Sequence, residues 1–525
     1  MAFYSYHAYV PSGEHRLYTV ICLPNKEGSF PTVLYRWPYV VDEETASDEA
    51  LCEAKQALYR PWLEAGYAVV YQHCRGTGKS SGEFIPYICE RQDGLALQEW
   101  VRQQSFYNGE LFVTGRSYGS SVHYETMPFA PDIKGAVLEV QVCRRYSAAY
   151  RNGFFKIGLA GNWYVDMYKK RNRRYKAFTP ESFHTLPMAD FSRTVFGEEA
   201  EAFNALLMSP RAEDPAWDVD APKWEALQNA DIPILFTTGF YDIYTGGIFD
   251  QWRELSAATR AKGALLVQPY DHGATEEKLP LAFPNGRLSE AFGNHVLRWF
   301  EAVRGKEDYF LPRGKVTYYN LFENRWHSDD FTQPEQYVDL PLGEGERTYR
   351  YNPYNPASFK GGLSANFGGT AYQDPPNSRY DILSFFTQPF DRDYPVKGQI
   401  SAQLRVRSDC EDTCFYMRLS LVTEQGDYGL RDDILSLAQV CPDYVPGTEA
   451  TVTFTFDDHA FLIRAGQRLR IDISSSAFPL YIRHTNQKGH YALQTTAKTA
   501  ENTVICDGSF IRLPTEQPPE REERI

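Results

Sequence analysis

A serine flanked by two glycines stands where an apolar segment ends. Residues 111–121 read LFVTGRSYGSS, so Gly115, Ser117 and Gly119 follow the spacing G-x-S-x-G. A strand can run into this turn and a helix can leave it, and a side chain at either glycine would then collide with neighbouring backbone. The pattern predicts that Ser117 is a nucleophile exposed at the end of a sheet. The alternative is an ordinary glycine turn with a surface serine.

A serine hydroxyl attacks only when a base removes its proton, and a carboxylate must hold that base in the right tautomer. After a turn of this kind, the acid and then the histidine follow along the chain, each at the carboxyl end of a strand. Asp242 comes just after the apolar segment 234–238, and His272 comes after the segment 264–267. We therefore predict Ser117, His272 and Asp242 as nucleophile, base and acid.

Four other residues could compete for these roles. Asp250 falls in the helix after Asp242, and Asp271 is adjacent to the base, where it cannot easily fold back to orient it. His123 lies on the helix leaving the turn and is expected to point away from the serine as a packing residue. His73 could be structural or catalytic, and the structural role is favoured.

The tetrahedral intermediate also needs hydrogen-bond donors for its oxyanion. The backbone N–H of Tyr118, the residue after the nucleophile, should supply one donor, and a loop after an early strand should supply the second. That loop is 35–39, and the phenol of Tyr39 could donate from it. The alternative role for Tyr39 is to stack beneath a cap, and the spacing does not decide between the two.

Alternating apolar segments and amphipathic helices before residue 142 and after residue 231 predict a mostly parallel sheet covered on both faces. Its expected strands are 32–35, 68–72, 111–114, 136–140, 234–237 and 264–267. A helix is expected over 288–304, with Gly305 ending it. The aromatic stretch 143–230 interrupts the alternation and should form a helical cap.

From about residue 309 the helical periodicity nearly disappears. Short alternating strands are expected at 315–319, 399–406, 416–422, 450–456 and 468–473. Turns rich in Gly, Pro, Asn and Asp separate them, which predicts an all-β domain with a jelly-roll sandwich. The predicted organisation is residues 1–142 and 231–308 as the two parts of an α/β domain, 143–230 as the inserted cap, and 309–525 as the jelly roll.

Composition excludes several classes of function. A net charge of -14 argues against a nucleic-acid partner, and the basic cluster 169–174 is expected to be a solvated surface. No long apolar segment could cross a membrane, and the beginning of the chain does not resemble a secretory signal, so we expect a cytoplasmic protein. The nine cysteines show no metal-ligand spacing, and Cys410 and Cys414 are expected to be thiols. No cofactor or metal is predicted, and a homo-oligomer is possible.

With these residues assembled, the chain resembles the family of X-prolyl dipeptidyl aminopeptidases, cocaine esterase and α-amino-acid ester hydrolases over nearly its whole length. The matching segments, in chain order, are 37–39, 75–84, 90–100, the Ser117 turn, 239–242, 316–326, 386–389 and 473–479. The resemblance implies an α/β-hydrolase domain with a helical cap and a jelly roll. It also implies that Ser117, Asp242 and His272 form a triad, and that Tyr39 and Tyr118 form the oxyanion hole.

The loop 73–82, HCRGTGKSSG, contains a GK pair but has His73 where a phosphate-binding loop needs glycine. By the resemblance it is the family's Arg-Gly loop beside the active site, and no nucleotide is implied. The family commonly has aspartate where His73 stands and glycine where Ser120 stands, and often no acid before the base. These departures leave the triad intact and concern the pocket.

The predicted function is a serine hydrolase that forms an acyl-enzyme from an ester or an amide. The sequence does not separate a dipeptidyl peptidase acting after proline from an esterase or amidase. A peptidase would need a carboxylate for the substrate ammonium, and the cap offers Asp166, Glu181, Asp190 and Glu213. The alternative is a non-catalytic binding protein that uses the jelly roll on a decayed hydrolase, against which the complete triad argues.

Overall fold

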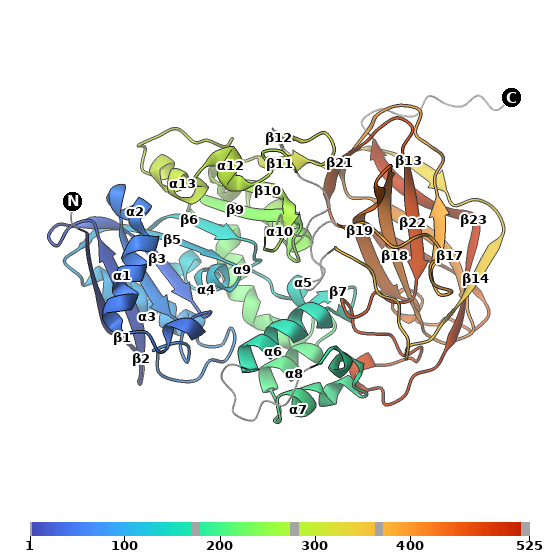
Figure 1. Ribbon diagram of the computed structural model, residues 1–525, viewed down its shortest axis with the longest axis horizontal. Helices are drawn as coiled ribbons and strands as arrows, with labels where there is room; N and C mark the ends of the chain where they lie inside the picture. Colours follow the sequence, from blue (N-terminus) through green and yellow to red (C-terminus); the bar gives the residue numbers. More distant parts are fainter. Residues whose placement is uncertain (1–2, 170–178, 274–282, 363–370, 516–525) are drawn as a thin grey trace.

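A computed structural model describes residues 3–169, 179–273, 283–362 and 371–515. In Figure 1 an α/β part and an all-β part lie side by side, and a helical layer lies beneath the junction between them. The basic cluster 169–174 falls almost wholly outside the described residues. In the described part, no helix combines the length and the apolar character that crossing a membrane requires.

One large sheet organises the α/β part. Its strands are β1 (Tyr4–Ser12), β2 (His15–Leu23), β3 (Phe30–Trp37), β4 (Ala68–His73), β5 (Tyr107–Arg116), β6 (Ile133–Glu139), β9 (Ile234–Tyr241), β10 (Ala264–Asp271), β11 (Val316–Asn320) and β12 (Arg325–Asp329). They lie in the order β1-β2-β4-β3-β5-β6-β9-β10-β11-β12. The strands from β4 to β11 are parallel, whereas β1, β2 and β12 pair antiparallel. All six strands expected for a parallel sheet are present.

Helices cover both faces because successive strand residues point to opposite sides. On β4, Val69 packs into one buried cluster and Val70 into another. The first cluster includes side chains of α1 (Asp48–Leu58), α2 (Arg60–Glu64), α12 (Leu288–Phe292) and α13 (His295–Val303). The second includes side chains of α3 (Glu90–Arg102), α4 (Tyr118–Tyr124), α9 (Ala221–Gln228) and α10 (Thr245–Glu254). A further helix, α11 (Ala257–Lys262), precedes β10.

The single helix expected over 288–304 is two helices. Gly293 adopts a φ of 65°, which ends α12, and the Asn294 side chain then accepts a hydrogen bond from Leu297 N to begin α13. Apolar residues at helical spacing continue through both helices, so the sequence pattern did not indicate the break. The expected end at Gly305 is close to correct, since α13 ends at Val303.

Residues 143–230 form helices and loops between β6 and β9, as the texture of the sequence predicted. The elements are α5 (Tyr146–Ala149), the short hairpin β7 (Tyr150–Arg151) and β8 (Phe154–Phe155), α6 (Asn162–Lys169), α7 (Phe191–Val195), α8 (Glu201–Leu207) and α9. Their aromatic side chains join side chains of the all-β part in one buried cluster. The inserted layer is therefore packed against the all-β part, and its Trp163 packs against a small buried cluster of the α/β part.

The all-β part contains two larger antiparallel sheets. One holds β13 (Gln336–Pro341), β14 (Glu346–Tyr351), β17 (Ser401–Ser408), β20 (Glu449–Thr455) and β23 (Ala500–Thr515). The other holds β15 (Leu383–Phe386), β18 (Cys414–Thr423), β19 (Gly426–Ser436) and β22 (Arg468–Ser474), with α14 (Leu437–Val440) following β19. A separate pair joins β16 (Tyr394–Gly398) to β21 (His459–Ile463). Four of the five strands expected here are observed in these sheets.

The fifth expected strand, 315–319, belongs elsewhere. It is β11, which pairs parallel with β10 through the register Leu265 to Val316 and extends the α/β sheet. The expectation that the strand 315–319 belongs to the all-β sheets is therefore wrong, and β12, which pairs with β11, also lies in the α/β sheet. No helix follows β11, so the local pattern resembled an antiparallel domain while the pairing was made with a strand some fifty residues earlier.

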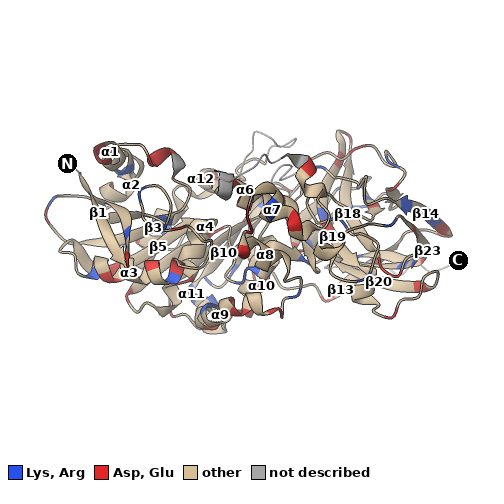
Figure 2. Cartoon of the chain, turned by 90° about the horizontal axis from the view of Figure 1, so that it is seen from below, with Lys and Arg blue, Asp and Glu red and all other residues tan. Residues whose placement is uncertain are grey.

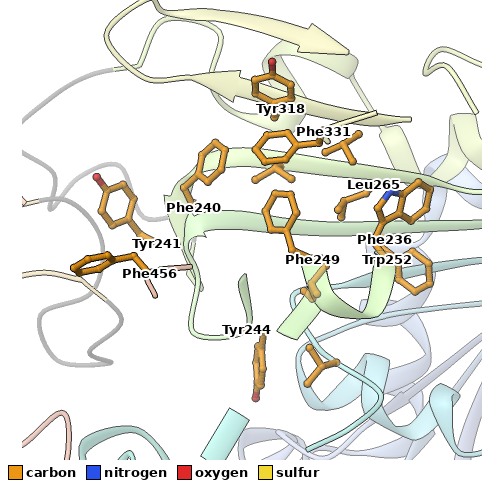
Figure 3. Close-up of a cluster of buried hydrophobic side chains, with 14 of the residues drawn as sticks. Phe236, Phe240, Tyr241, Tyr244, Phe249, Trp252, Leu265, Tyr318, Phe331 and Phe456 are labelled. Atoms are coloured by element: carbon orange, nitrogen blue, oxygen red, sulfur yellow. The ribbon is translucent and has the colours of Figure 1, made fainter. Parts of the chain in front are cut away.

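An aromatic cluster joins β9 and α10 to the all-β part (Figure 3). Tyr241, the last residue of β9, donates from its phenol to the Gly429 carbonyl of β19 at 2.9 Å. The buried Arg431 of the same strand donates to the Phe240 carbonyl and, at 2.5 Å, to the Asp458 carbonyl. The all-β part thus holds the carboxyl end of β9, the segment that leads into Asp242.

Candidate active site

The serine turn is strained in the way its sequence predicted. Ser117 adopts φ 54° and ψ −126° between β5 and α4. A Cβ placed on Gly115 would lie 2.1 Å from the Gly119 carbonyl oxygen, and one on Gly119 would lie 2.7 Å from the Trp37 ring. Only glycine fits at these two positions, so the chain turns sharply enough to present the serine at the end of the sheet.

The structure brings the three expected residues together. The Nε2 atom of His272 lies 2.9 Å from Ser117 Oγ, and its Nδ1 atom lies 3.3 Å from Asp242 Oδ1. Asp242 is wholly buried, and its Oδ1 atom also accepts a hydrogen bond from Tyr244 N at 2.9 Å. His272 is about one-third exposed. A buried carboxylate therefore faces one ring nitrogen of a histidine, and the serine hydroxyl faces the other.

Two neighbours of the serine brace this arrangement, and the sequence gave no sign of either role. The guanidinium of Arg116 donates to the His272 carbonyl and so ties the loop after β10 to the serine turn. The hydroxyl of Ser120 donates to the Gly115 carbonyl at 2.5 Å and accepts from Glu139 N at 2.9 Å. The serine found where glycine is common in the family thus joins the ends of β5 and β6.

The residue after the nucleophile is fixed through its side chain. The buried phenol of Tyr118 donates to Glu90 Oε1 at 2.8 Å and accepts from Tyr87 N at 2.8 Å. Burial raises the pKa of the Glu90 carboxyl, and it does so despite the ion pair with Arg36 at 2.9 Å. These contacts tie the first residue of α4, whose backbone N–H is the expected oxyanion donor, to the beginning of α3 and the loop before it.

Tyr39 lies where the second oxyanion donor was expected, on the wall of the cavity that contains Ser117. Its phenol oxygen accepts a hydrogen bond from the indole N–H of Trp163 at 2.9 Å. The Trp163 ring also stacks on Tyr118, with ring centres 5.7 Å apart. Both roles considered for Tyr39, donor and stacking residue beneath the cap, are compatible with this position. The sequence contained no pattern that would have identified Trp163 of the cap as a residue of this site.

The cavity has a volume of about 520 Å³ and lies between the serine turn and the cap. Its walls are mostly aromatic and apolar side chains. Of the four carboxylates that the sequence offered for a substrate ammonium, Asp166 lines it, whereas Glu181, Asp190 and Glu213 are not among the lining residues. Arg145 contributes a guanidinium, which the sequence analysis did not single out.

None of the four rival residues lines the cavity that contains Ser117. His123 is buried in α4, and burial, with Arg36 nearby, lowers its pKa to about 3. Asp250 lies in α10, and the Asp271 carboxylate accepts a hydrogen bond from Gly273 N at 3.0 Å. These positions agree with the roles that the sequence favoured.

His73 is structural in its contacts. It is wholly buried, its Nε2 atom lies 2.9 Å from Glu43 Oε2, and its Nδ1 atom accepts from Lys79 N at 3.2 Å. Burial lowers the pKa of His73. The histidine therefore shapes the loop 73–82 from inside and does not line the active-site cavity.

The backbone N–H groups of the loop 73–82 donate hydrogen bonds within the loop itself. Gly76 N donates to the Ser81 carbonyl, Thr77 N to the Cys74 carbonyl and Ser80 N to the Thr77 carbonyl, each at 3.0 to 3.1 Å. A phosphate-binding loop would direct such N–H groups at its ligand. The GK pair in this loop is therefore part of a turn packed beside the α/β sheet.

A strained serine between a strand and a helix, with a histidine and a carboxylate after two neighbouring parallel strands, defines a serine hydrolase of the α/β-hydrolase class. Residues 12–274 match the family model of the X-Pro dipeptidyl-peptidase (S15 family), and residues 312–511 match that of the X-Pro dipeptidyl-peptidase C-terminal non-catalytic domain. The chain belongs to the X-Pro dipeptidyl-peptidase S15 family.

Known relatives agree with this assignment. The chain is 24% identical to cocaine esterase of Rhodococcus sp. (strain MB1 Bresler), over 93% of this chain and 94% of the relative. Its fold matches an aminopeptidase from a marine sediment Thaumarchaeota archaeon with a TM-score of 0.80 at 18% identity, covering 97% of this chain and 96% of the other. It matches an α-amino acid ester hydrolase with a TM-score of 0.80 at 18% identity, covering 98% and 96%.

Proposed function

We propose that the protein hydrolyses an ester or an amide through an acyl-enzyme on Ser117. The observation that carries the proposal is the 2.9 Å contact between His272 Nε2 and Ser117 Oγ, with Asp242 at 3.3 Å from the other ring nitrogen. Geometry of this kind lets the imidazole accept the serine proton as the hydroxyl attacks a carbonyl carbon. The buried Asp242 carboxylate then stabilises the imidazolium.

The attack produces a tetrahedral intermediate with a negative oxygen. We assign its stabilisation to the Tyr118 N–H and the Tyr39 O–H, which flank Ser117 in the cavity wall. His272 then returns its proton to the leaving alcohol or amine, and the carbon–oxygen or carbon–nitrogen bond breaks. A water molecule, deprotonated by His272, attacks the acyl-enzyme, and the acid is released with Ser117 restored.

The test compares hydrolysis of 4-nitrophenyl butyrate by the parent protein and by the Ser117→Ala variant. The proposal predicts saturable turnover by the parent, with kcat in the variant lower by about 10⁶-fold or to the uncatalysed background. The Ser105→Ala variant, which changes a serine outside the cavity, serves as the matched control and should retain parental activity. Equal turnover by parent and Ser117→Ala would contradict the proposal.

A second candidate function, removal of an X-Pro dipeptide, rests on Asp166, the one carboxylate from the four cap candidates that lines the cavity. A dipeptidyl peptidase must bind the substrate ammonium, so blocking that group should abolish cleavage. The measurement is the rate with Ala-Pro-4-nitroanilide beside its N-acetylated form. Equal rates would exclude the aminopeptidase version and leave an esterase or amidase.

A further inference from the structure

Arg145 directs unused donors toward the active-site cavity. It lies at the start of the cap and lines the same cavity as Ser117. Its Nε atom donates to Asp220 Oδ1 at 2.9 Å, and its backbone N–H donates to Asp220 Oδ2 at 2.8 Å. Among the described residues, no hydrogen bond is made to either Nη atom. Asp220 thus fixes one edge of the guanidinium and leaves its other edge for a ligand.

The surroundings of Arg145 carry an excess of positive charge. Asp220 is shared with Lys223 at 2.9 Å, and Lys223 also pairs with Glu125. Glu125 in turn pairs with Arg91 at 3.1 Å. This chain of contacts joins three cations to two carboxylates. Lys223, Asp220 and Glu125 are buried, so water screens their ion pairs only weakly, whereas Arg91 at the far end is about two-fifths exposed. Asp220 is therefore shared between two cations, and a ligand carboxylate would give Arg145 a counter-charge of its own.

Two aromatic rings, those of Tyr87 and Tyr118, lie between Arg145 and the serine turn. Its Cζ atom lies 4.8 Å from the centre of the Tyr87 ring, and the Tyr87 ring lies 4.8 Å from the Tyr118 ring. Tyr118 directly follows Ser117, so the guanidinium is no further from that ring than these two distances combined. Arg145 and Ser117 also line one cavity, so we expect a short aliphatic chain to reach from a carbonyl at Ser117 to a carboxylate at Arg145.

We propose that the acyl group taken by this site carries its own carboxylate, which the Nη atoms of Arg145 bind. The inference rests on the proposed acyl-enzyme chemistry and specifies its substrate class, half-esters or half-amides of dicarboxylic acids. One ester bond and one water are consumed, and a dicarboxylate and an alcohol are released. Arg145 suits this role because a guanidinium binds a planar carboxylate through two parallel hydrogen bonds.

Figure 2 shows acidic and basic residues intermingled along both parts of the chain, so the acidic residues behind the net charge of -14 are not gathered in one part. Recognition of an anion by this acidic protein would depend on local contacts. Arg145 is therefore the residue to alter, and Arg144 provides a matched control. Arg144 is about two-fifths exposed and pairs with Glu254 at 2.8 Å.

The kinetic test uses two substrates of the same shape, the mono-4-nitrobenzyl ester of adipic acid and its neutral adipamate analogue. The parent should hydrolyse the anionic ester with the higher kcat/KM. Arg145→Gln should lower that value by about 10- to 100-fold and leave the neutral ester within about 3-fold, because a hydrogen bond to a charged group is lost only with the first substrate. Arg144→Gln should change neither value, and Arg145→Lys should retain part of the preference.

A parent with no preference for the anionic ester, or an equal loss on both substrates in Arg145→Gln, would overturn the inference. Calorimetry with adipate on the Ser117→Ala protein separates this outcome from a failure of the proposed chemistry, because binding needs no nucleophile. We expect adipate binding that Arg145→Gln removes and Arg144→Gln preserves. Absence of adipate binding up to tens of millimolar would also overturn the inference, even if the parent hydrolyses the neutral ester.

Discussion

Replacement of Tyr241 by phenylalanine tests whether the all-β part positions the acid of the site. The Tyr241 phenol donates to the Gly429 carbonyl at 2.9 Å, and the side chain is buried at the residue before Asp242. The Tyr241→Phe variant leaves that carbonyl without its partner, which costs about 1–3 kcal/mol of unfolding free energy. Since a misplacement of about 1 Å can cost about 100-fold in rate, we expect kcat to fall by between about 3- and 100-fold.

Tyr351→Phe provides a matched control for stability. Its buried phenol donates to the His484 carbonyl at 3.0 Å within the all-β part, away from Asp242. Both variants should unfold at lower urea concentrations by similar amounts, whereas only Tyr241→Phe should lose activity on 4-nitrophenyl butyrate. If the two variants lose stability equally and keep equal kcat, the contact with Gly429 does not position the acid and the reasoning is refuted.

Three further changes test the site and its support. Asp242→Asn should lower kcat by about 10⁴-fold with little change in KM, and an undiminished kcat would exclude Asp242 as the acid. His123→Gln should flatten the fall of the unfolding free energy at acid pH. The pKa of His123 is about 3 in the folded protein, which lies below its unfolded value. The stability that neutral His123 allows is therefore complete above about pH 6.5 and is lost at about 1.4 kcal/mol per pH unit as the pH falls toward 3. Urea midpoints between pH 7 and 5 measure this, and parallel slopes for the two proteins would contradict it. Gly115→Ala should abolish activity, because the new Cβ would lie 2.1 Å from the Gly119 carbonyl oxygen, and full activity would show that the turn can relax.

The residues of the candidate site were predictable because parallel strands end at one edge of a sheet. Ser117, Asp242 and His272 each follow such a strand, so chain order and strand ends were enough to select them. Local spacing also explained both glycines of the turn. The choice of these three residues therefore follows from patterns that extend over only a few residues each.

The supporting residues were beyond this reasoning. Trp163 and Arg145 come from the cap and line the cavity, and Arg431 of the all-β part holds the strand that leads into Asp242. Their contacts join distant parts of the chain and leave no local sequence pattern. The sheet that β11 joins was mispredicted for the same reason, since its pairing with β10 is long-range. Propensity predicts an element and its face, whereas the choice of partner is made by tertiary packing.

The intact mass of the protein after brief exposure to a fluorophosphonate tests the central claim most directly. A hydroxyl activated by His272 reacts with this reagent, whereas an ordinary serine does not react in the same time. The account predicts a single adduct on the parent and none on the Ser117→Ala variant. An unlabelled parent, or an adduct of equal yield on both proteins, would contradict the assignment of Ser117 as an activated nucleophile.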